Sequence, residues 1–339
     1  MPSDVSTVGV IVNPHAGKDV RRLTSGASHV PDATKIGIVR RVIAGAVEAG
    51  AQRILLGADR SGLALQAASG LDAPTAALDG PLTSSHLDSV TAAREMWKED
   101  ADVVVVLGGD GTCRDVAAGW PNAPMIPIST GTNNVFPCAV DGTSAGVAAG
   151  LVATQAVACG DVAIEAKRLV VSVDDTDADT TATESALVDV ALVDARFVGA
   201  RAVTDPRTIV WVVAAIAEPT ATGLAAIAGR VEPVGRNEPG GVVVRTGAGG
   251  RRVRVPLAPG TFTTLGIESV ETLAASTPVV LPGGGMLAFD GERTKAVSAS
   301  ASISVSIEPS GPQVIDVDRT LAIAAAQSRF DVTEVADGH

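Results

Sequence analysis

Aromatic residues are scarce in this chain of 339 residues: they make up 2%, and tyrosine does not occur. Single-stranded nucleic acids are commonly bound by stacking their bases on aromatic side chains, so that class of function is disfavoured. Basic residues are also few, with 26 Lys and Arg against 38 Asp and Glu and a formal charge of −12. A negative field repels phosphate backbones and anionic lipids, so we expect neither nucleic acid nor membrane as a partner.

The three cysteines, Cys113, Cys138 and Cys159, are far apart in the sequence and form no Cys-x-x-Cys pair. This spacing favours neither a disulfide framework nor a zinc site, and it is typical of a reducing compartment. The N-terminal segment lacks the basic stretch and apolar run of a signal peptide. The longest apolar run, residues 209–217, is far shorter than the ~20 residues that a membrane helix needs. We therefore expect a cytoplasmic protein.

Hydrophobic residues make up 46% of the chain, enough for a large core built from Ala, Val, Leu and Ile. In the first half, short apolar runs alternate with segments of helical periodicity. The run at residues 102–107 is unbroken and β-branched, as expected of a parallel strand that is covered on both faces. The alternation predicts a doubly wound α/β domain over residues 1–150. Its expected strands include 9–12, 53–56 and 102–107, and its expected helices are 36–49 and 89–97.

The second half contains many strand-like segments and few helical ones. We expect an antiparallel, sandwich-like β domain over residues 151–322, with the domain change near 142–162. A helix or strand is expected at 320–330, and the C-terminal segment 323–339 is expected to pack on the first domain. Strands are expected at 187–197, 209–215, 241–246, 251–257 and 302–307, and a short helix at 221–228.

Two turns are also predicted in this β-rich half. Residues 242–255 have the pattern of a hairpin around a Gly-rich turn. The acidic stretch at 174–183 is expected to be a solvated hairpin loop rather than a linker between domains.

The strongest functional signal is the sequence GGDGT at residues 108–112, directly after the buried strand. Open α/β sheets bind ligands at the carboxyl ends of their strands. Glycines there let the backbone approach a phosphate, and the N-terminus of a helix starting near Cys113 adds positive charge. Asp110 is not needed for phosphate binding, so we interpret it as a general base, acting directly or through Mg²⁺. The structural alternative is a tight turn in which Asp110 caps the helix.

Three further segments have polar side chains next to glycine. Residues 127–137 contain Ser, Thr and Asn, which bind phosphate or ribose oxygens or, equally, cap a helix. Residues 13–18, Asn-Pro-His-Ala-Gly-Lys, follow the first strand but lack the spacing of a P-loop. Residues 289–292, Phe-Asp-Gly-Glu, are either a hairpin turn or a pair of carboxylates that face a cleft.

Together these segments resemble the superfamily of NAD kinases, diacylglycerol kinases and sphingosine kinases. Its members share a GGDGT motif in an α/β domain that is followed by a β-rich domain. The resemblance covers nearly the whole chain, and residues 193–207 and 223–230 look most like the acetoin catabolism protein X branch. That branch is usually described as ATP-NAD kinase-like. The resemblance implies a kinase that uses ATP and Mg²⁺ on a small-molecule acceptor, in a superfamily where homodimers and tetramers are common.

The resemblance also implies roles for individual residues. Asp110 corresponds to the essential aspartate of the superfamily, which we expect to be catalytic. Asp290 is expected to bind Mg²⁺. Phosphate or nucleotide binding is implied for Asn13, Gly108, Gly109, Gly111, Thr112, Gly131, Thr132, Asn134 and Glu292.

Two departures from the superfamily pattern concern the acceptor. GGDGT is followed by Cys113-Arg114-Asp115 where lipid kinases have Leu-Asn-Glu, and the Tyr-containing segment of NAD kinases is absent. The leading hypothesis is a kinase that transfers a phosphoryl group from ATP or polyphosphate to a hydroxyl. NAD ranks first as acceptor, a small alcohol or sugar second and a lipid last. The alternative is a non-catalytic nucleotide-binding regulator linked to acetoin catabolism.

Overall fold

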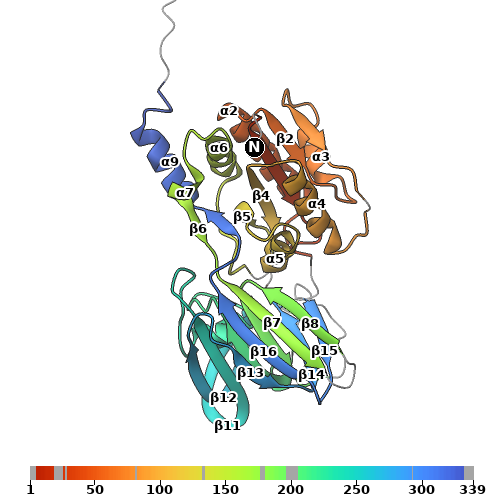
Figure 1. The fold of residues 1–339 in the computed structure, drawn as a ribbon, viewed down its shortest axis with the longest axis vertical. Coiled ribbons are helices and arrows are strands. Elements are labelled where there is room, and N and C mark those ends of the chain that lie inside the picture. The colour runs from red at the N-terminus through yellow and green to blue at the C-terminus, as the bar shows by residue number, and fades with distance from the viewer. Residues whose placement is uncertain are drawn as a thin grey trace, which may run out of the picture.

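The computed structural model describes residues 5–18, 26, 29–80, 82–131, 134–175, 180–195, 205–291 and 293–331. Two predicted nucleotide-binding residues, Thr132 and Glu292, lie outside this range, as do parts of the segments 174–183 and 187–197. The described strands form three sheets, of seven, six and four strands. Figure 1 shows the seven-stranded sheet with its helices in one body and the other two sheets in a second body below it.

The first body is an α/β unit, as predicted. Its sheet has the order β3-β2-β1-β4-β5-β17-β6, and only the last strand runs antiparallel to its neighbour. Both β1 and β4 are buried along their whole length, which explains their unbroken apolar sequences. The strands are β1 (Thr7–Val12), β2 (Arg53–Leu56), β3 (Thr75–Ala77), β4 (Val103–Gly108), β5 (Pro124–Ser129), β6 (Ala163–Glu165) and β17 (Gln313–Ile315).

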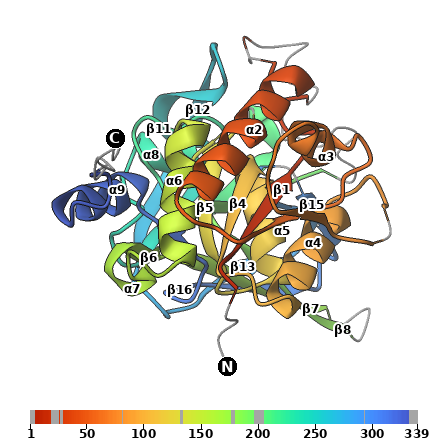
Figure 2. The same ribbon diagram turned by 90° about the horizontal axis from the view of Figure 1, so that it is seen from above.

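Helices cover both faces of this sheet. One core cluster joins α2, α3, α6 and α9 to the sheet, and another joins α4 and α5 to the opposite face. Figure 2 shows α2 and α6 side by side, where glycines of α6 let the two backbones approach closely. The helices are α2 (Asp32–Glu48), α3 (Leu63–Ala68), α4 (Leu87–Lys98), α5 (Asp110–Gly119), α6 (Gly142–Ala153), α7 (Cys159–Val162) and α9 (Val317–Ala326).

The second body is an antiparallel sandwich, also as predicted. Its sheets have the orders β12-β11-β10-β9-β14-β15 and β13-β16-β7-β8, and a core cluster of apolar residues lies between them. A further cluster packs α8 (Ala225–Gly229) on the outer face of the six-stranded sheet. The strands are β7 (Arg168–Asp175), β8 (Thr180–Ala186), β9 (Asp189–Val193), β10 (Ile209–Ala214), β11 (Gly241–Ala258), β12 (Thr261–Leu273), β13 (Val279–Pro282), β14 (Gly285–Phe289), β15 (Arg293–Val297) and β16 (Ser302–Glu308).

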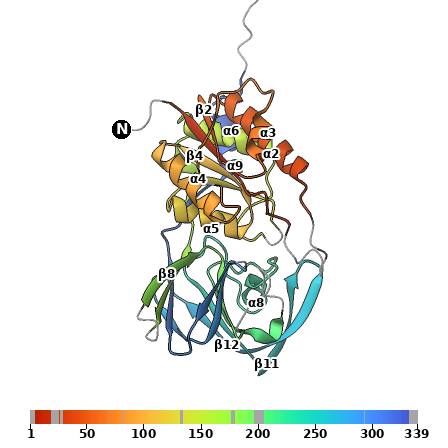
Figure 3. The ribbon, with the colours of Figure 1, turned by 90° about the vertical axis from the view of Figure 1, so that its right-hand side faces the viewer.

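The predicted hairpin at residues 242–255 is wrong. These residues belong to the single strand β11, which pairs with β12 in the long arm seen in Figure 3. Thr246 and Arg251 both pair with Ile267, so the intervening glycine-rich residues form a bulge instead of a turn. By contrast, β7 and β8 do form a hairpin around the acidic stretch, with residues 176–179 outside the described part. In the described residues, no helix is long and apolar enough to cross a membrane.

Candidate active site

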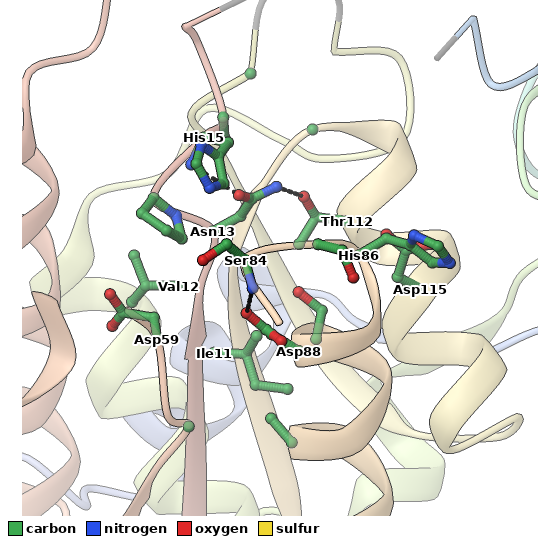
Figure 4. A pocket seen from close by; sticks show the side chains of 18 of the residues that line it. Ile11, Val12, Asn13, His15, Asp59, Ser84, His86, Asp88, Thr112 and Asp115 are labelled. Atoms are coloured by element: carbon green, nitrogen blue, oxygen red, sulfur yellow. Dashed lines mark hydrogen bonds between the residues drawn. The ribbon is translucent and has the colours of Figure 1, made fainter. Parts of the chain in front are cut away.

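A cavity of about 670 Å³ lies at the carboxyl ends of β1, β2 and β4 (Figure 4). Parallel sheets place the loops after neighbouring strands at one edge, and ligand sites form there. The loops after β1 and β2, the start of α4 and the first turn of α5 all line the cavity. Arg293 and Thr294 of β15 also line it, so both bodies contribute to its wall.

The GGDGT sequence forms the junction between β4 and α5. Gly108 ends the strand, and Gly109 is the residue before the helix. A Cβ atom on Gly108 would lie 2.3 Å from Cβ of Thr112, so glycine is required for this abrupt turn. The helix begins at Asp110, earlier than the sequence pattern indicated. Gly109 and Thr112 line the cavity, so the first turn of the helix lies at its wall.

Asn13 joins the loop after β1 to this junction. Its Nδ2 donates to Oγ1 of Thr112 at 2.8 Å, and its Oδ1 accepts from the N–H of His15 at 2.8 Å. Figure 4 shows these side chains together at the cavity. The buried Lys35 donates its Nζ to the carbonyls of Asn13 (3.2 Å) and Pro14 (2.9 Å). Burial, reinforced by Lys18, lowers the pKa of Lys35 to about 8.

The loop after β5 contributes Gly131, which lines the cavity beside Gly109. Asn134 braces this loop: its Nδ2 donates to the Gly131 carbonyl at 2.7 Å, and its Oδ1 accepts from the Gly131 N–H at 3.1 Å. Asn134 is not among the residues that line the cavity. Its observed contacts therefore give it a role in shaping the loop.

Asp110 is the first residue of α5 and is 6% exposed. Its Oδ1 accepts hydrogen bonds from the N–H groups of Val135 (2.9 Å) and Phe136 (2.8 Å). The carboxylate thus joins the start of the helix to the loop after β5. Asp110 does not itself line the cavity, although Gly109 and Thr112 on either side of it do.

The expectation that Asp290 binds Mg²⁺ does not fit the structure. Its side chain is fully buried and accepts hydrogen bonds from the N–H groups of Leu187 (3.1 Å) and Val188 (2.9 Å). Arg114 Nη1 lies 3.5 Å from its Oδ2. Among the described residues, no group of three or more His, Cys, Asp or Glu side chains has the arrangement of a metal site. We therefore assign Asp290 to the packing of the two bodies.

Arg114 and Asp115 were not predicted as site residues, yet both are buried and line the cavity. Arg114 donates from Nη1 to the Phe289 carbonyl at 2.9 Å and from Nη2 to Oδ1 of Asp115 at 3.1 Å. Burial raises the pKa of Asp115 to about 6, and Arg114 partly offsets this effect. Arg293 also lines the cavity and pairs with Glu184 at 3.1 Å. Asp115 could have been predicted from its position shortly after GGDGT, whereas no sequence motif indicates Arg293.

The opposite wall also contains residues that the sequence reasoning missed. Asp59 accepts the N–H of Leu63 at 2.9 Å before α3, and burial raises its pKa. Asp88 on α4 accepts the N–H of Ser84 at 2.9 Å, and both residues line the cavity (Figure 4). His86 lines the same wall. In the sequence, Asp59 and Asp88 each lie four residues from their hydrogen-bond partner near the start of a helix. Such an Asp is common in proteins of every function, so this pattern does not predict a site.

Comparisons with known proteins agree with this architecture. Residues 8–156 match the ATP-NAD kinase N-terminal domain, and residues 167–310 match the acetoin catabolism protein X C-terminal domain. A crystal structure of yeast NADH kinase complexed with NADH superposes with a TM-score of 0.57 at 12% identity, covering 99% of this chain and 91% of that chain. At that identity the match shows a shared fold.

A close sequence relative is the acetoin catabolism protein X of Cupriavidus necator. It is 34% identical over 324 residues, which cover 91% of this chain and 90% of that protein. The chain therefore belongs to the acetoin catabolism protein X family, with an ATP-NAD kinase N-terminal domain in its first half.

Proposed function

We propose that this protein is a phosphotransferase that moves the γ-phosphoryl group of MgATP to a hydroxyl of a small acceptor. The observation that carries the proposal is the convergence of Gly109, Thr112 and Asn13 on one cavity at the carboxyl edge of the sheet. The dipole at the start of α5 favours a phosphate there. Such local binding is needed because the overall charge of −12 repels a nucleotide.

In this proposal Asp110 accepts the proton of the acceptor hydroxyl. Two backbone N–H groups hold one of its oxygens, and cavity-lining residues stand on both sides of it. Catalytic hydrogen bonds are often completed only when substrate is bound, so the ligand-free orientation is compatible with the role. A general base of this kind contributes roughly 10²–10⁴-fold in rate.

Mg²⁺ belongs to the nucleotide substrate in this proposal. In kinases it is usually held by phosphates together with one or two carboxylates, and it neutralises charge on the transferred group. Asp59 and Asp115 are carboxylates that line the cavity, and they are our candidates for such contacts.

NAD is our first candidate for the acceptor, followed by a small alcohol or sugar. A volume of about 670 Å³ suits a nucleotide-sized ligand. Among the described residues, no Phe or Trp side chain lines the cavity, so a base or nicotinamide ring would contact the aliphatic Ile11, Val12 and Pro14. Polar and charged side chains in the lining, such as His15 and Asp59, disfavour a lipid. The name of the Cupriavidus relative supports the proposal that the reaction belongs to acetoin catabolism.

A nucleotide-binding regulator is the rival function, and the position of Asp110 outside the cavity lining favours it. A transfer screen separates the two. Purified protein, Mg²⁺ and [γ-³²P]ATP or polyphosphate are incubated with NAD, NADH and a panel of alcohols and sugars, while ATP binding is measured by calorimetry. We expect labelled product from at least one acceptor. ATP binding without any transfer would identify a regulator.

A further inference from the structure

We propose that Arg236 is a positioning residue for Asp110, acting through the peptide unit that joins Val135 to Phe136. The inference rests on the proposed function for its catalytic consequence, whereas the contacts themselves do not depend on it. Arg236 belongs to the loop between α8 and β11 in the second body. It therefore connects the β sandwich to the predicted catalytic residue of the first body.

The guanidinium of Arg236 binds two successive carbonyls of the loop after β5. Nη2 donates to the Val135 carbonyl at 2.8 Å, and Nη1 donates to the Phe136 carbonyl at 3.2 Å. Nη1 also lies 3.5 Å from Sγ of Cys138, and Nε donates to Oε1 of Glu218 at 3.2 Å. The planar fork of arginine suits two acceptors held side by side, which a lysine ammonium matches less well.

The Val135 carbonyl and the Phe136 N–H belong to the same peptide unit. The carbonyl accepts from Arg236, and the N–H donates to Oδ1 of Asp110 at 2.8 Å. The three groups therefore form a continuous chain from cation through peptide to carboxylate. Hydrogen bonds in such chains polarise one another, so the cation makes the N–H a stronger donor to the buried carboxylate.

Other contacts hold the rest of this loop. The Cys138 N–H donates to the Pro127 carbonyl at 3.0 Å, and the Ser129 N–H donates to the Cys138 carbonyl at 2.9 Å. The backbone at the far end of the loop is thus held by its own hydrogen bonds, whereas the guanidinium binds the carbonyls of Val135 and Phe136. The ion pair with Glu218 is about one-third exposed on both sides, so we expect it to contribute little by itself.

Amide hydrogen exchange tests the contact without any need for catalysis. In the full-length Arg236→Ala variant we expect the Phe136 amide to exchange ~10-fold faster, as for the loss of a charge-assisted hydrogen bond. Arg230→Ala is the matched control, since Arg230 is an exposed arginine in the same loop. Unchanged exchange in Arg236→Ala would overturn the proposal. If that variant does not fold, Arg236→Lys takes its place, and we expect a smaller increase in the exchange rate of the Phe136 amide.

Kinetics then test the catalytic consequence. With an acceptor from the transfer screen, Arg236→Ala should lower kcat ~10-fold and leave KM for ATP within about twofold, because Arg236 acts through Asp110. Adding Arg236→Ala to Asp110→Asn should cost nothing further. Multiplicative losses in the double variant would contradict the proposal. If the wild-type protein transfers no phosphoryl group, the proposed function fails while the exchange experiment still decides the contact.

Discussion

The ionisation of Asp115 gives a prediction that depends directly on the buried groups beside the cavity. Burial is the main cause that raises its pKa from 3.8 to about 6, and Asp290 adds to the effect while Arg114 opposes it. The folded protein therefore binds this proton more tightly than the unfolded chain does. Protonated Asp115 therefore adds to the free energy of unfolding. This contribution is fully present below about pH 4 and is lost as the pH rises to about 6. A change from 3.8 to about 6 corresponds to about 3 kcal/mol.

The perturbation is Asp115→Asn, which keeps the side-chain shape and an oxygen that can accept from Arg114. Urea unfolding followed by circular dichroism from pH 4 to pH 8 gives the free energy of unfolding. Relative to the variant, we expect the wild type to lose up to about 3 kcal/mol between pH 4 and pH 6 and nothing more above pH 7. Asp161→Asn, at an exposed site, is the control and should run parallel to the wild type. Parallel curves for Asp115→Asn would refute the reasoning.

Three further predictions concern the helices and loops around the site. Gly146→Ala should lower the melting temperature, because the new Cβ would lie 2.2 Å from the Val42 carbonyl oxygen. Gly37→Ala on α2 is the control and should raise the melting temperature, because alanine favours helix and the new Cβ would meet only the end of the Arg41 side chain at 3.7 Å. Since the pKa of Lys35 is lowered to about 8, the wild type should gain more unfolding free energy than Lys35→Met between pH 8 and pH 10 in urea titrations. Thr112→Val removes the acceptor of the 2.8 Å bond from Asn13, so calorimetry should record ATP binding weakened by roughly 3–10-fold.

The parts of the fold that sequence predicts well are those with a single dominant pattern. The apolar runs of β1 and β4 are buried on both faces, and the alternating sequence of β16 matches its alternating burial. Helix α6 was not predicted because most of its residues are buried, so its sequence has no clear helical periodicity. In β11, the glycines that suggested a turn instead form a bulge, since the pairing with β12 continues past them.

The same distinction between local patterns and long-range packing applies to the residues of the candidate site. Asn13, Gly109 and Thr112 were predicted from motifs that follow strands, and they do meet at the cavity. Asp290 belongs to a motif too, but its surroundings depend on how β14 packs against α5, which no local pattern encodes. Arg236 was missed for the same reason, because its partners lie about 100 residues away in the sequence.

The central claim is that Asp110 acts as the base in phosphoryl transfer at this cavity. The most direct measurement compares kcat for transfer from MgATP by the wild type and by Asp110→Asn, with an acceptor from the screen. Asparagine retains an oxygen that can accept from Val135 and Phe136, so the fold and the affinity for ATP should be preserved. We predict that kcat falls by at least ~100-fold in the variant. A folded Asp110→Asn protein that keeps near-normal kcat would contradict the claim.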